Sequence, residues 1–249
     1  MRFGANFIVI RSMIRLGIMG AMPEEIEGLL PQIENAETTE LGLRKYISGR
    51  INNVEVVVVF SRWGKVAAAS TAATLIHQFQ ITHLIFSGVA GALNPNLKLA
   101  DVILAQSLVQ HDLDARPFMP QFEIPLLGKT LIETSTFLNE ILNAACCSLN
   151  FEPHHGLIAS GDQFFKSESQ KNQVLQAFPE VLCVEMEGAA VAQVCFEHHL
   201  PFAVIRIISD TANEHAALDF QAFITHVSAV KLDQIILKAC NILATESSK

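Results

Sequence analysis

The segment RLGIMGAMPEEIEGLL, residues 15–30, joins a strand-like stretch to a helical pattern. Its first five residues are mostly apolar and predict a β-strand. The turn Gly20–Glu25 follows, in which Pro23 suits the first turn of a helix and the glutamates suit the positive N-terminus of that helix. Apolar residues then recur at positions 26, 29, 30 and 33, which is the spacing of one helical face. We therefore predict a strand that runs directly into a helix.

The same alternation of strands and helices continues along the chain. Asn52-Asn53 separates Tyr46–Gly49 from Val54–Phe60, which predicts a hairpin, and Val56–Val59 is apolar on both faces, as in a central strand. Further strands are expected at His83–Ser87, Asp101–Ala105, Leu157–Ser160, Leu182–Val184 and Phe202–Ile208. Helices are expected at Lys65–Gln78, Lys129–Ser148, Ser169–Ala177, Gly188–Glu197 and Phe220–Leu243. This order predicts an α/β fold, with a mixed, largely parallel central sheet flanked by helices.

Length and composition favour a single domain with a large core. The chain has 249 residues, of which 50% are hydrophobic and 17% charged, and we assign residues 15–245 to one domain. The net charge of −8 and the lack of a Lys/Arg cluster argue against nucleic-acid binding. The apolar stretch Phe7–Ile10 is too short for a signal peptide or a membrane span. Residues 1–14 are expected to be an N-terminal extension, of which 1–12 are dispensable.

Cysteine and histidine spacing gives no metal site. The five cysteines are odd in number and form no CxxC pair, which predicts buried free thiols in a reducing cytoplasm. Adjacent histidines, as in His154-His155, point apart and cannot share a metal ion. The chain also has no P-loop and no GxGxxG pattern. We expect neither a metal nor a cofactor.

Six predicted strand ends carry glycine, serine or carboxylate residues. In α/β sheets, ligands bind at the carboxyl ends of strands, so these segments predict one shared pocket. They are Gly20–Glu25, Ser61–Lys65, Gly88–Gly91, Ser160–Phe165, Glu185–Glu187 and Ser209-Asp210.

Three carboxylates among these segments, Glu25, Glu187 and Asp210, are candidates for chemistry. Each of them alone could equally cap a helix. Glu185 and Glu187 flank Met186 at the end of an apolar strand, where alternation points the two glutamates to one face and Met186 to the other. Carboxylates beside a core strand are costly unless they bind something. Burial would also raise the pKa of Asp210, as a general acid near neutral pH requires.

Five motifs occur in a recognisable order. They are GAMPEE (20–25), GKVAAA (64–69), SGD (160–162), VEME (184–187) and ISD (208–210). Together they closely resemble the bacterial 5′-methylthioadenosine/S-adenosylhomocysteine nucleosidases of the purine nucleoside phosphorylase superfamily. The resemblance covers roughly Arg15 to Leu243. It implies hydrolysis of the N-glycosidic bond of both nucleosides to adenine and a thio-ribose, in methionine salvage and methyl-cycle by-product removal.

The resemblance also implies catalytic roles. Asp210 would protonate the imidazole-side ring nitrogen of adenine, and Ser209 would orient Asp210. Glu25 and Arg206 would hold and activate the attacking water. Cleavage builds positive charge on the ribose and negative charge on the base, so an acid at one end and an anion at the other suit the reaction.

Substrate-binding roles are implied for a second set of residues. Glu187 would bind the ribose hydroxyls, with Met186 under the sugar and Glu185 beside them. Phe164 would stack on adenine, and the backbone of Phe165 would read its edge.

Two substitutions depart from the family pattern. Val89 stands where a serine or threonine usually helps to hold the water. Trp63 replaces an aliphatic residue that lines the 5′-alkylthio pocket. Its indole would either narrow that pocket, favouring 5′-methylthioadenosine over S-adenosylhomocysteine, or swing outward and cover the rim.

The loop Asp112–Phe122 carries apolar Phe118 and Met119 among prolines and aspartates. In this family the equivalent loop closes the 5′ pocket of a neighbouring subunit. The resemblance therefore implies a cytoplasmic homodimer in which Phe118 contacts substrate, and no membrane partner.

Three other functions remain open. The first is a phosphorylase of the same fold, but an ionised Glu25 about 4 Å from phosphate costs roughly 4 kcal/mol per unit charge at an effective dielectric constant near 20. The second is a hydrolase of another 5′-modified purine nucleoside, such as futalosine, which Trp63 and Val89 suggest. The third is a non-catalytic nucleoside-binding protein, which has no need of Glu25, Glu187 and Asp210 together.

Overall fold

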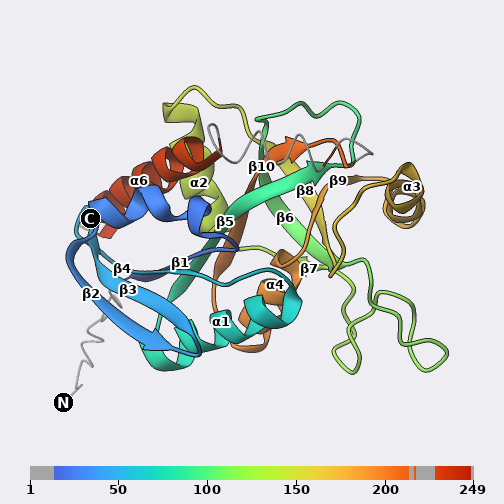
Figure 1. The fold of residues 1–249 in the computed structure, drawn as a ribbon, viewed down its shortest axis with the longest axis horizontal. Helices are drawn as coiled ribbons and strands as arrows, with labels where there is room; N and C mark the ends of the chain where they lie inside the picture. Colours follow the sequence, from blue (N-terminus) through green and yellow to red (C-terminus); the bar gives the residue numbers. More distant parts are fainter. Residues whose placement is uncertain (1–13, 213–215, 217–227, 248–249) are drawn as a thin grey trace, which may run out of the picture.

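The computed structural model describes residues 14–212, 216 and 228–247, and these residues build one ten-stranded mixed sheet (Figure 1). The strands are β1 (Arg15–Gly20), β2 (Glu34–Leu41), β3 (Arg44–Ile51), β4 (Val54–Phe60), β5 (His83–Ala92), β6 (Val102–Gln110), β7 (Ile132–Glu133), β8 (His154–Ser160), β9 (Val181–Glu185) and β10 (Phe202–Asp210). The helices are η1 (Pro23–Glu25), η2 (Glu27–Gln32), α1 (Lys65–Phe79), α2 (Thr136–Ser148), α3 (Glu168–Ala177), α4 (Gly188–Glu197) and α6 (Ser228–Ser247), of which η1 and η2 are 3₁₀ turns.

Part of the sheet closes on itself. β5 pairs with β10, β10 with β6, β6 with β8, β8 with β9, and β9 again with β5. The sheet continues from β5 through β1, β4 and β3 to the edge strand β2. Parallel pairs join β1 to β4 and β5, β10 to β5, and β8 to β6 and β9, whereas the other pairs are antiparallel. The predicted mixed sheet flanked by helices is therefore confirmed.

Helices cover the sheet in pairs. α1 packs against α4 on one side, and α2 packs against α6 on the other (Figure 1). The α1–α4 pair shares a core with Phe86 of β5 and Val204 of β10, and the α2–α6 pair shares one with Ile18 of β1 and Ile205 of β10. α3 stands apart and packs through Val174 on a smaller cluster that includes Phe165. These layers leave the carboxyl ends of β1, β4, β8, β9 and β10 free to build a site.

The stretch after β1 differs from the prediction. Ile26, Leu29 and Ile33 are buried as expected, but the backbone forms the two 3₁₀ turns η1 and η2 rather than an α-helix. Pro31 lies inside η2, where it has no N–H to donate and its ring would clash with a carbonyl of an α-helix. The apolar spacing therefore predicted correctly which residues are buried, but it predicted the wrong type of helix.

Two other segments depart from the sequence-based assignments. The helix expected over Lys129–Ser148 begins only at Thr136, where the side chain of Ser135 accepts a hydrogen bond from the N–H of Leu138, and Ile132–Glu133 instead pairs with β6. β2 was not expected at all. All its residues are exposed, and its glutamates give a solvated edge that resists pairing with other chains.

Some expectations concern residues outside the described ranges. They are residues 1–13 of the expected N-terminal extension and the first residues of the helix expected at Phe220–Leu243. All five cysteines are free, and only Cys147 is exposed. Within the described ranges, no helix is both long enough and apolar enough to cross a bilayer.

Asp233 is a buried carboxylate that contributes unfavourably to stability. Asp233 is 8% exposed, and its carboxylate packs against Gly28 of η2. A Cβ at Gly28 would be only 1.9 Å from Oδ2 of Asp233. Burial, together with the charge of Glu27, raises the pKa of Asp233 to about 6. The folded protein therefore binds a proton at Asp233 more tightly than the unfolded chain does. This stabilises the fold at a pH below the ordinary pKa of aspartate, and the stabilisation is lost as the pH rises through 6.

We predict that Asp233→Asn raises the free energy of unfolding at pH 7.5 by about 1 kcal/mol, a value reduced for solvent screening. The gain should shrink as the pH falls below 6 and vanish near pH 4, as measured by denaturant unfolding across this range. Glu27→Gln is the matched control and should give a smaller gain of the same sign. A loss of stability at pH 7.5 in Asp233→Asn would contradict the assignment.

Candidate active site

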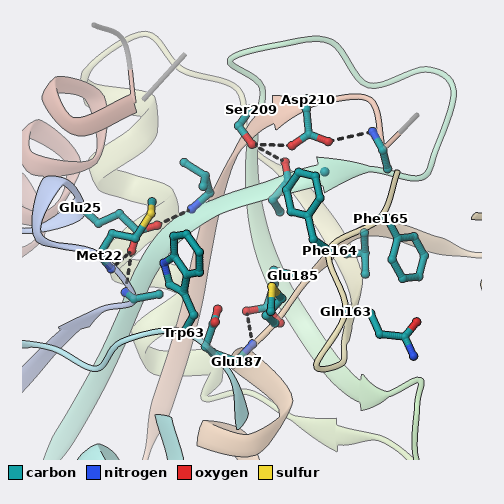
Figure 2. A pocket seen from close by; sticks show the side chains of 17 residues that line it. Met22, Glu25, Trp63, Gln163, Phe164, Phe165, Glu185, Glu187, Ser209 and Asp210 are labelled. Carbon is teal, nitrogen blue, oxygen red and sulfur yellow. Dashed lines mark hydrogen bonds between the residues drawn. The ribbon is translucent and has the colours of Figure 1, made fainter. Parts of the chain in front are cut away.

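The six segments picked out in the sequence line one cavity of about 430 Å³ (Figure 2). Five of them lie at or directly after strand ends, and Gly88–Gly91 lies inside β5, which is longer than expected. Figure 2 shows Ser209 and Asp210 at the top of the cavity, Glu25 and Met22 at the left, and Glu185 and Glu187 below both groups. The predicted shared pocket is confirmed.

Glu25 is fixed by the turn that follows β1. Its side chain is 3% exposed, Oε2 accepts hydrogen bonds from the N–H groups of Ala21 (2.6 Å) and Met22 (3.0 Å), and Oε1 accepts one from Val89 (3.1 Å). Burial raises the pKa of Glu25, while the charge of Arg206 and these three donors act in the opposite direction. Glu25 is therefore a rigidly held carboxyl with the raised proton affinity of a general base.

Arg206 of β10 lies beneath the cavity at 1% exposure. Its guanidinium carbon is 4.1 Å from the centre of the Phe86 ring, and Nη1 donates to the carbonyls of Phe86 (3.1 Å) and Ile205 (3.0 Å). A Cβ on Gly88 would be 2.7 Å from Oε1 of Glu25 and 3.3 Å from Nη1 of Arg206. Glycine at this position thus lets a carboxylate and a guanidinium converge on one point.

Asp210 is aimed by an irregularity in β10. The register with β5 shifts between Ile208 and Asp210, a bulge that turns the side chain toward the cavity. Ser209 Oγ donates to Oδ2 at 2.8 Å, and the N–H of Ala212 donates to Oδ1 at 2.8 Å. Gly91, the partner of Asp210 across the sheet, leaves room because a Cβ there would be 2.8 Å from Oδ1. Ser209 is therefore placed to orient Asp210.

The VEME segment changes direction at the end of β9. The strand stops at Glu185, and Glu187 is the residue before α4, so Glu185, Met186 and Glu187 all line the cavity. The expectation that Met186 points away from the two glutamates is wrong, because strand alternation ends with the strand. Glu187 Oε1 accepts a 2.7 Å hydrogen bond from the N–H of Gly64. Burial and the charge of Glu185 raise the pKa of Glu187 to about 8, although Gly64 and Arg206 lower it.

Aromatic side chains complete the cavity. The ring of Phe164 lies close to Asp210, whereas the ring of Phe165 points away and packs edge-on against His111, with centroids 5.1 Å apart (Figure 2). Trp63 lines the cavity from its rim and is 63% exposed. Phe118 is 89% exposed on its loop and does not line the cavity of its own chain.

Sequence reasoning missed several contributors. Gly64 acts through its backbone N–H, Gly88 acts by having no side chain, and Met22 and Gln163 line the wall. Val89 had been named as a site residue, but the hydrogen bond from its N–H to Glu25 had not been foreseen. Gly64 and Gly88 lie in glycine-bearing segments that had been noted, but the pattern carried no sign of their partners. No cluster of His, Cys, Asp and Glu suited to a metal ion occurs in the described part of the chain.

The site therefore combines a carboxyl held by Ser209, a second carboxylate on the cavity floor, and a carboxylate–guanidinium pair around Gly88. Such an arrangement can protonate a leaving group at one end and activate a small nucleophile at the other. The mostly apolar wall suits a neutral, aromatic ligand between them.

Known proteins are similar to this chain in sequence and in fold. Residues 15–240 match the family model described as the phosphorylase superfamily. The aminodeoxyfutalosine nucleosidase of Campylobacter jejuni is 34% identical over 92% of this chain and 99% of its own length. The 5′-methylthioadenosine/S-adenosylhomocysteine nucleosidase of Staphylococcus saprophyticus is 34% identical over 89% of this chain and 96% of its own.

Solved structures lead to the same group. The nucleosidase of Streptococcus pneumoniae with a transition-state inhibitor superposes with a TM-score of 0.86 at 34% identity, covering 92% of this chain and 99% of that one. The futalosine hydrolase of Helicobacter pylori superposes with a TM-score of 0.87 at 37% identity, covering 92% and 98%. The chain therefore belongs to the phosphorylase superfamily, among the nucleosidases of 5′-modified adenosines.

Proposed function

We propose that this protein hydrolyses the N-glycosidic bond of 5′-methylthioadenosine and S-adenosylhomocysteine, as a cytoplasmic enzyme of methionine salvage and methyl-cycle by-product removal. The observation that carries the proposal is the placement of Asp210, Glu187 and Glu25 around one cavity, with Arg206 close to Glu25 at Gly88. These groups match the leaving base, the ribose and the attacking water in turn. The reaction requires no cofactor.

Departure of adenine is assisted by Asp210. The base leaves with negative charge, which a proton on its imidazole-side ring nitrogen removes. Ser209 and the N–H of Ala212 hold the two oxygens of Asp210 and fix the direction of proton transfer. Phe164 stacks on the base, and the backbone of Phe165 lies beside its edge. Oriented proton transfer of this kind typically contributes about 10²- to 10⁴-fold in rate.

The ribose end is stabilised by Glu187. The N–H of Gly64 donates to Oε1 of Glu187, which leaves Oε2 for the sugar hydroxyls. Met186 packs under the ribose ring. The raised pKa of Glu187 falls when positive charge develops on the adjacent ribose, because an opposite charge favours the ionised carboxylate. Glu187 therefore interacts more strongly with the transition state than with the substrate.

Water is the nucleophile favoured by the Glu25–Arg206 pair. Glu25 accepts the proton of the water, and the positive charge of Arg206, whose Nη1 lies near Gly88, stabilises the attacking oxygen. An ionised Glu25 repels phosphate, which argues for hydrolysis over phosphorolysis. Val89 has no hydroxyl, but its N–H bonds to Glu25, so this position supports the water site through the backbone.

The second candidate substrate is aminodeoxyfutalosine. The Campylobacter jejuni and Staphylococcus saprophyticus nucleosidases are both 34% identical to this chain, although they are named for different substrates. Trp63 also gives the 5′ end of the cavity an aromatic rim in place of an aliphatic wall. All three nucleosides share the adenine and ribose contacts described above.

Adenine release from the three nucleosides, in phosphate-free buffer and with phosphate added, tests the reaction. We expect release without phosphate, and losses of about 10²- to 10⁴-fold in kcat for Asp210→Asn and Glu25→Gln. Asp233→Asn removes a buried carboxylate outside the cavity and should retain full activity. Strict dependence on phosphate would assign the protein to the phosphorylases. Near-wild-type turnover by either active-site variant would refute the role of that residue.

Replacing Trp63 by isoleucine tests the 5′ specificity. If the indole narrows the cavity, Trp63→Ile should raise kcat/KM for S-adenosylhomocysteine relative to 5′-methylthioadenosine by about tenfold or more. The two specificity constants are measured on the same preparation, so that the fraction of active enzyme cancels. An unchanged ratio would show that Trp63 only covers the rim.

We also propose that the protein is a homodimer whose 5′ pockets are shared. Leu43, Val66, Phe118 and Leu126 are exposed apolar side chains, and burial of Phe118 against a second subunit would remove one of them from water. The loop that carries Phe118 begins at Asp112, whose carboxylate is 2.6 Å from Lys65 Nζ, so the base of the loop is fixed beside the cavity.

Subunit mixing tests this arrangement. Phe118→Ala should raise KM by about tenfold, and adding an excess of inactive Asp210→Asn subunits should restore the KM, because each mixed dimer has one intact pocket. Analytical ultracentrifugation reports the mass. A monomer at assay concentration, or a KM that the second variant does not restore, would contradict a shared pocket.

A further inference from the structure

Glu185 lines the cavity, yet both oxygens of its carboxylate are bonded within the protein. Oε1 accepts from Ser160 Oγ and from the N–H of Gly188 at 2.9 Å. Oε2 accepts from the N–H of Glu187 (3.1 Å), from that of Gly188 (2.8 Å) and from Nη2 of Arg206 (2.7 Å). A carboxylate offers about four acceptor positions, and these are filled. Glu185 therefore has little capacity left for a substrate hydroxyl.

The contact with Arg206 fixes one side of the guanidinium. Nη2 points to Glu185, and Nη1 points to the carbonyls of Phe86 and Ile205. The stacking on Phe86 fixes the plane of the group. Among the described residues, Glu185 is the acceptor that Nη2 bonds to, so without Glu185 this side of the guanidinium is no longer held beside Gly88.

The remaining contacts fix the start of α4. The first N–H groups of a helix have no partner within the helix. Here those of Glu187 and Gly188 bond to Glu185, and that of Ala189 bonds to Ser160 Oγ at 2.7 Å. Gly188 allows this closeness, since a Cβ there would lie 3.1 Å from Oε1 of Glu185. Glu187 is thereby held at a fixed position on the cavity floor.

Glu185 also sets the charge balance of the site. The charged or titratable groups that interact with it or with its partner are Arg206 from β10, Glu187 before α4, Glu25 from η1, Cys183 from β9 and His111 from the loop after β6. The charge of Glu185 raises the pKa of Glu187, and it is the largest influence that raises the pKa of Arg206 against burial. Arg206, in turn, lowers the pKa of Glu25.

We infer that Glu185 is a positioning residue and not a substrate ligand: it aligns Arg206 with Glu25 at Gly88 and anchors Glu187 at the start of α4. This inference rests on the proposed hydrolysis. One carboxylate thus connects the water-activating pair with the ribose-binding carboxylate.

The Glu185→Gln variant separates this role from a purely structural one. It removes the negative charge beside Glu187 and leaves Arg206 without its ionic partner, so the pKa values of Glu187 and Glu25 should both fall. The acidic limb of kcat/KM should then move to lower pH by about one unit. The value of kcat at the plateau should fall about 10- to 100-fold, with a much smaller change in KM, because the water is misplaced while the adenine contacts remain.

Two further variants make the comparison specific. Glu185→Asp keeps the charge but shortens the side chain, so kcat should fall while the acidic limb stays at the wild-type pH. Asp233→Asn removes a different buried carboxylate and should alter neither. An unmoved limb in Glu185→Gln, or wild-type kcat in Glu185→Asp, would overturn the inference. The second criterion still applies if Glu185→Gln does not fold.

A carbon-13 NMR titration of the Glu187 carboxyl, assigned with Glu187→Gln, gives a readout that is independent of turnover. Its pKa should fall from about 8 in the wild type by about one unit in Glu185→Gln. Wild-type protein that releases no adenine from any of the three nucleosides overturns the proposed function. An unchanged Glu187 pKa in Glu185→Gln overturns the inference about Glu185 whether or not the wild type is active.

Discussion

A guanidinium that is 1% exposed lies beside three carboxylates, and the arrangement of the cavity depends on that charge. Removing a charged group from water costs several kcal/mol, and the attraction of one partner rarely exceeds that cost by much. The Arg206–Glu185 pair is therefore a weak contributor to stability. The pair instead fixes the positions of its two side chains. Hydrogen bonds to the strands orient Arg206, and the N–H groups at the start of α4 orient Glu185. Loss of either partner leaves an uncompensated buried charge, which is strongly destabilising.

The closed part of the sheet explains why these charges meet. β5, β9 and β10 belong to one ring of strands, so Gly88, Glu185 and Arg206 are neighbours although they are far apart in the sequence. Gly88 and Gly91 on β5 leave the space that Glu25, Arg206 and Asp210 occupy. The bulge in β10 turns Asp210 inward at the last residue of its strand. The bulge in β10 and the glycines of β5 thus contribute as much to the site as the charged residues do.

The sequence was most informative where hydrophobic periodicity and strand ends coincide. The strands from β3 to β10, apart from the short β7, and the pocket at their ends followed from apolar runs and the residues after them. β2 has no apolar face to detect, and Pro31 changed a helix into 3₁₀ turns without altering which residues are buried. The orientation of Met186 was wrong because alternation holds only within a strand. The partners of Glu185 lie on β8, α4 and β10, and no local pattern reports contacts over such sequence distances.

The raised pKa values of Glu25 and Glu187 reflect the free-energy cost of burying two carboxylates, and the same raised values suit the proposed chemistry. Burial opposes the ionisation of both carboxyls, and the charge of Glu185 adds to this effect at Glu187, so the empty cavity is electrostatically unfavourable. In the proposed hydrolysis, a ribose that develops positive charge would relieve this condition at Glu187, and the attacking water would pass its proton to Glu25. Both effects would be larger in the transition state than in the bound substrate, which is the requirement for a faster chemical step. The fold holds these carboxyls in place with backbone N–H groups, so the unfavourable charge cannot relax by moving away before the substrate arrives.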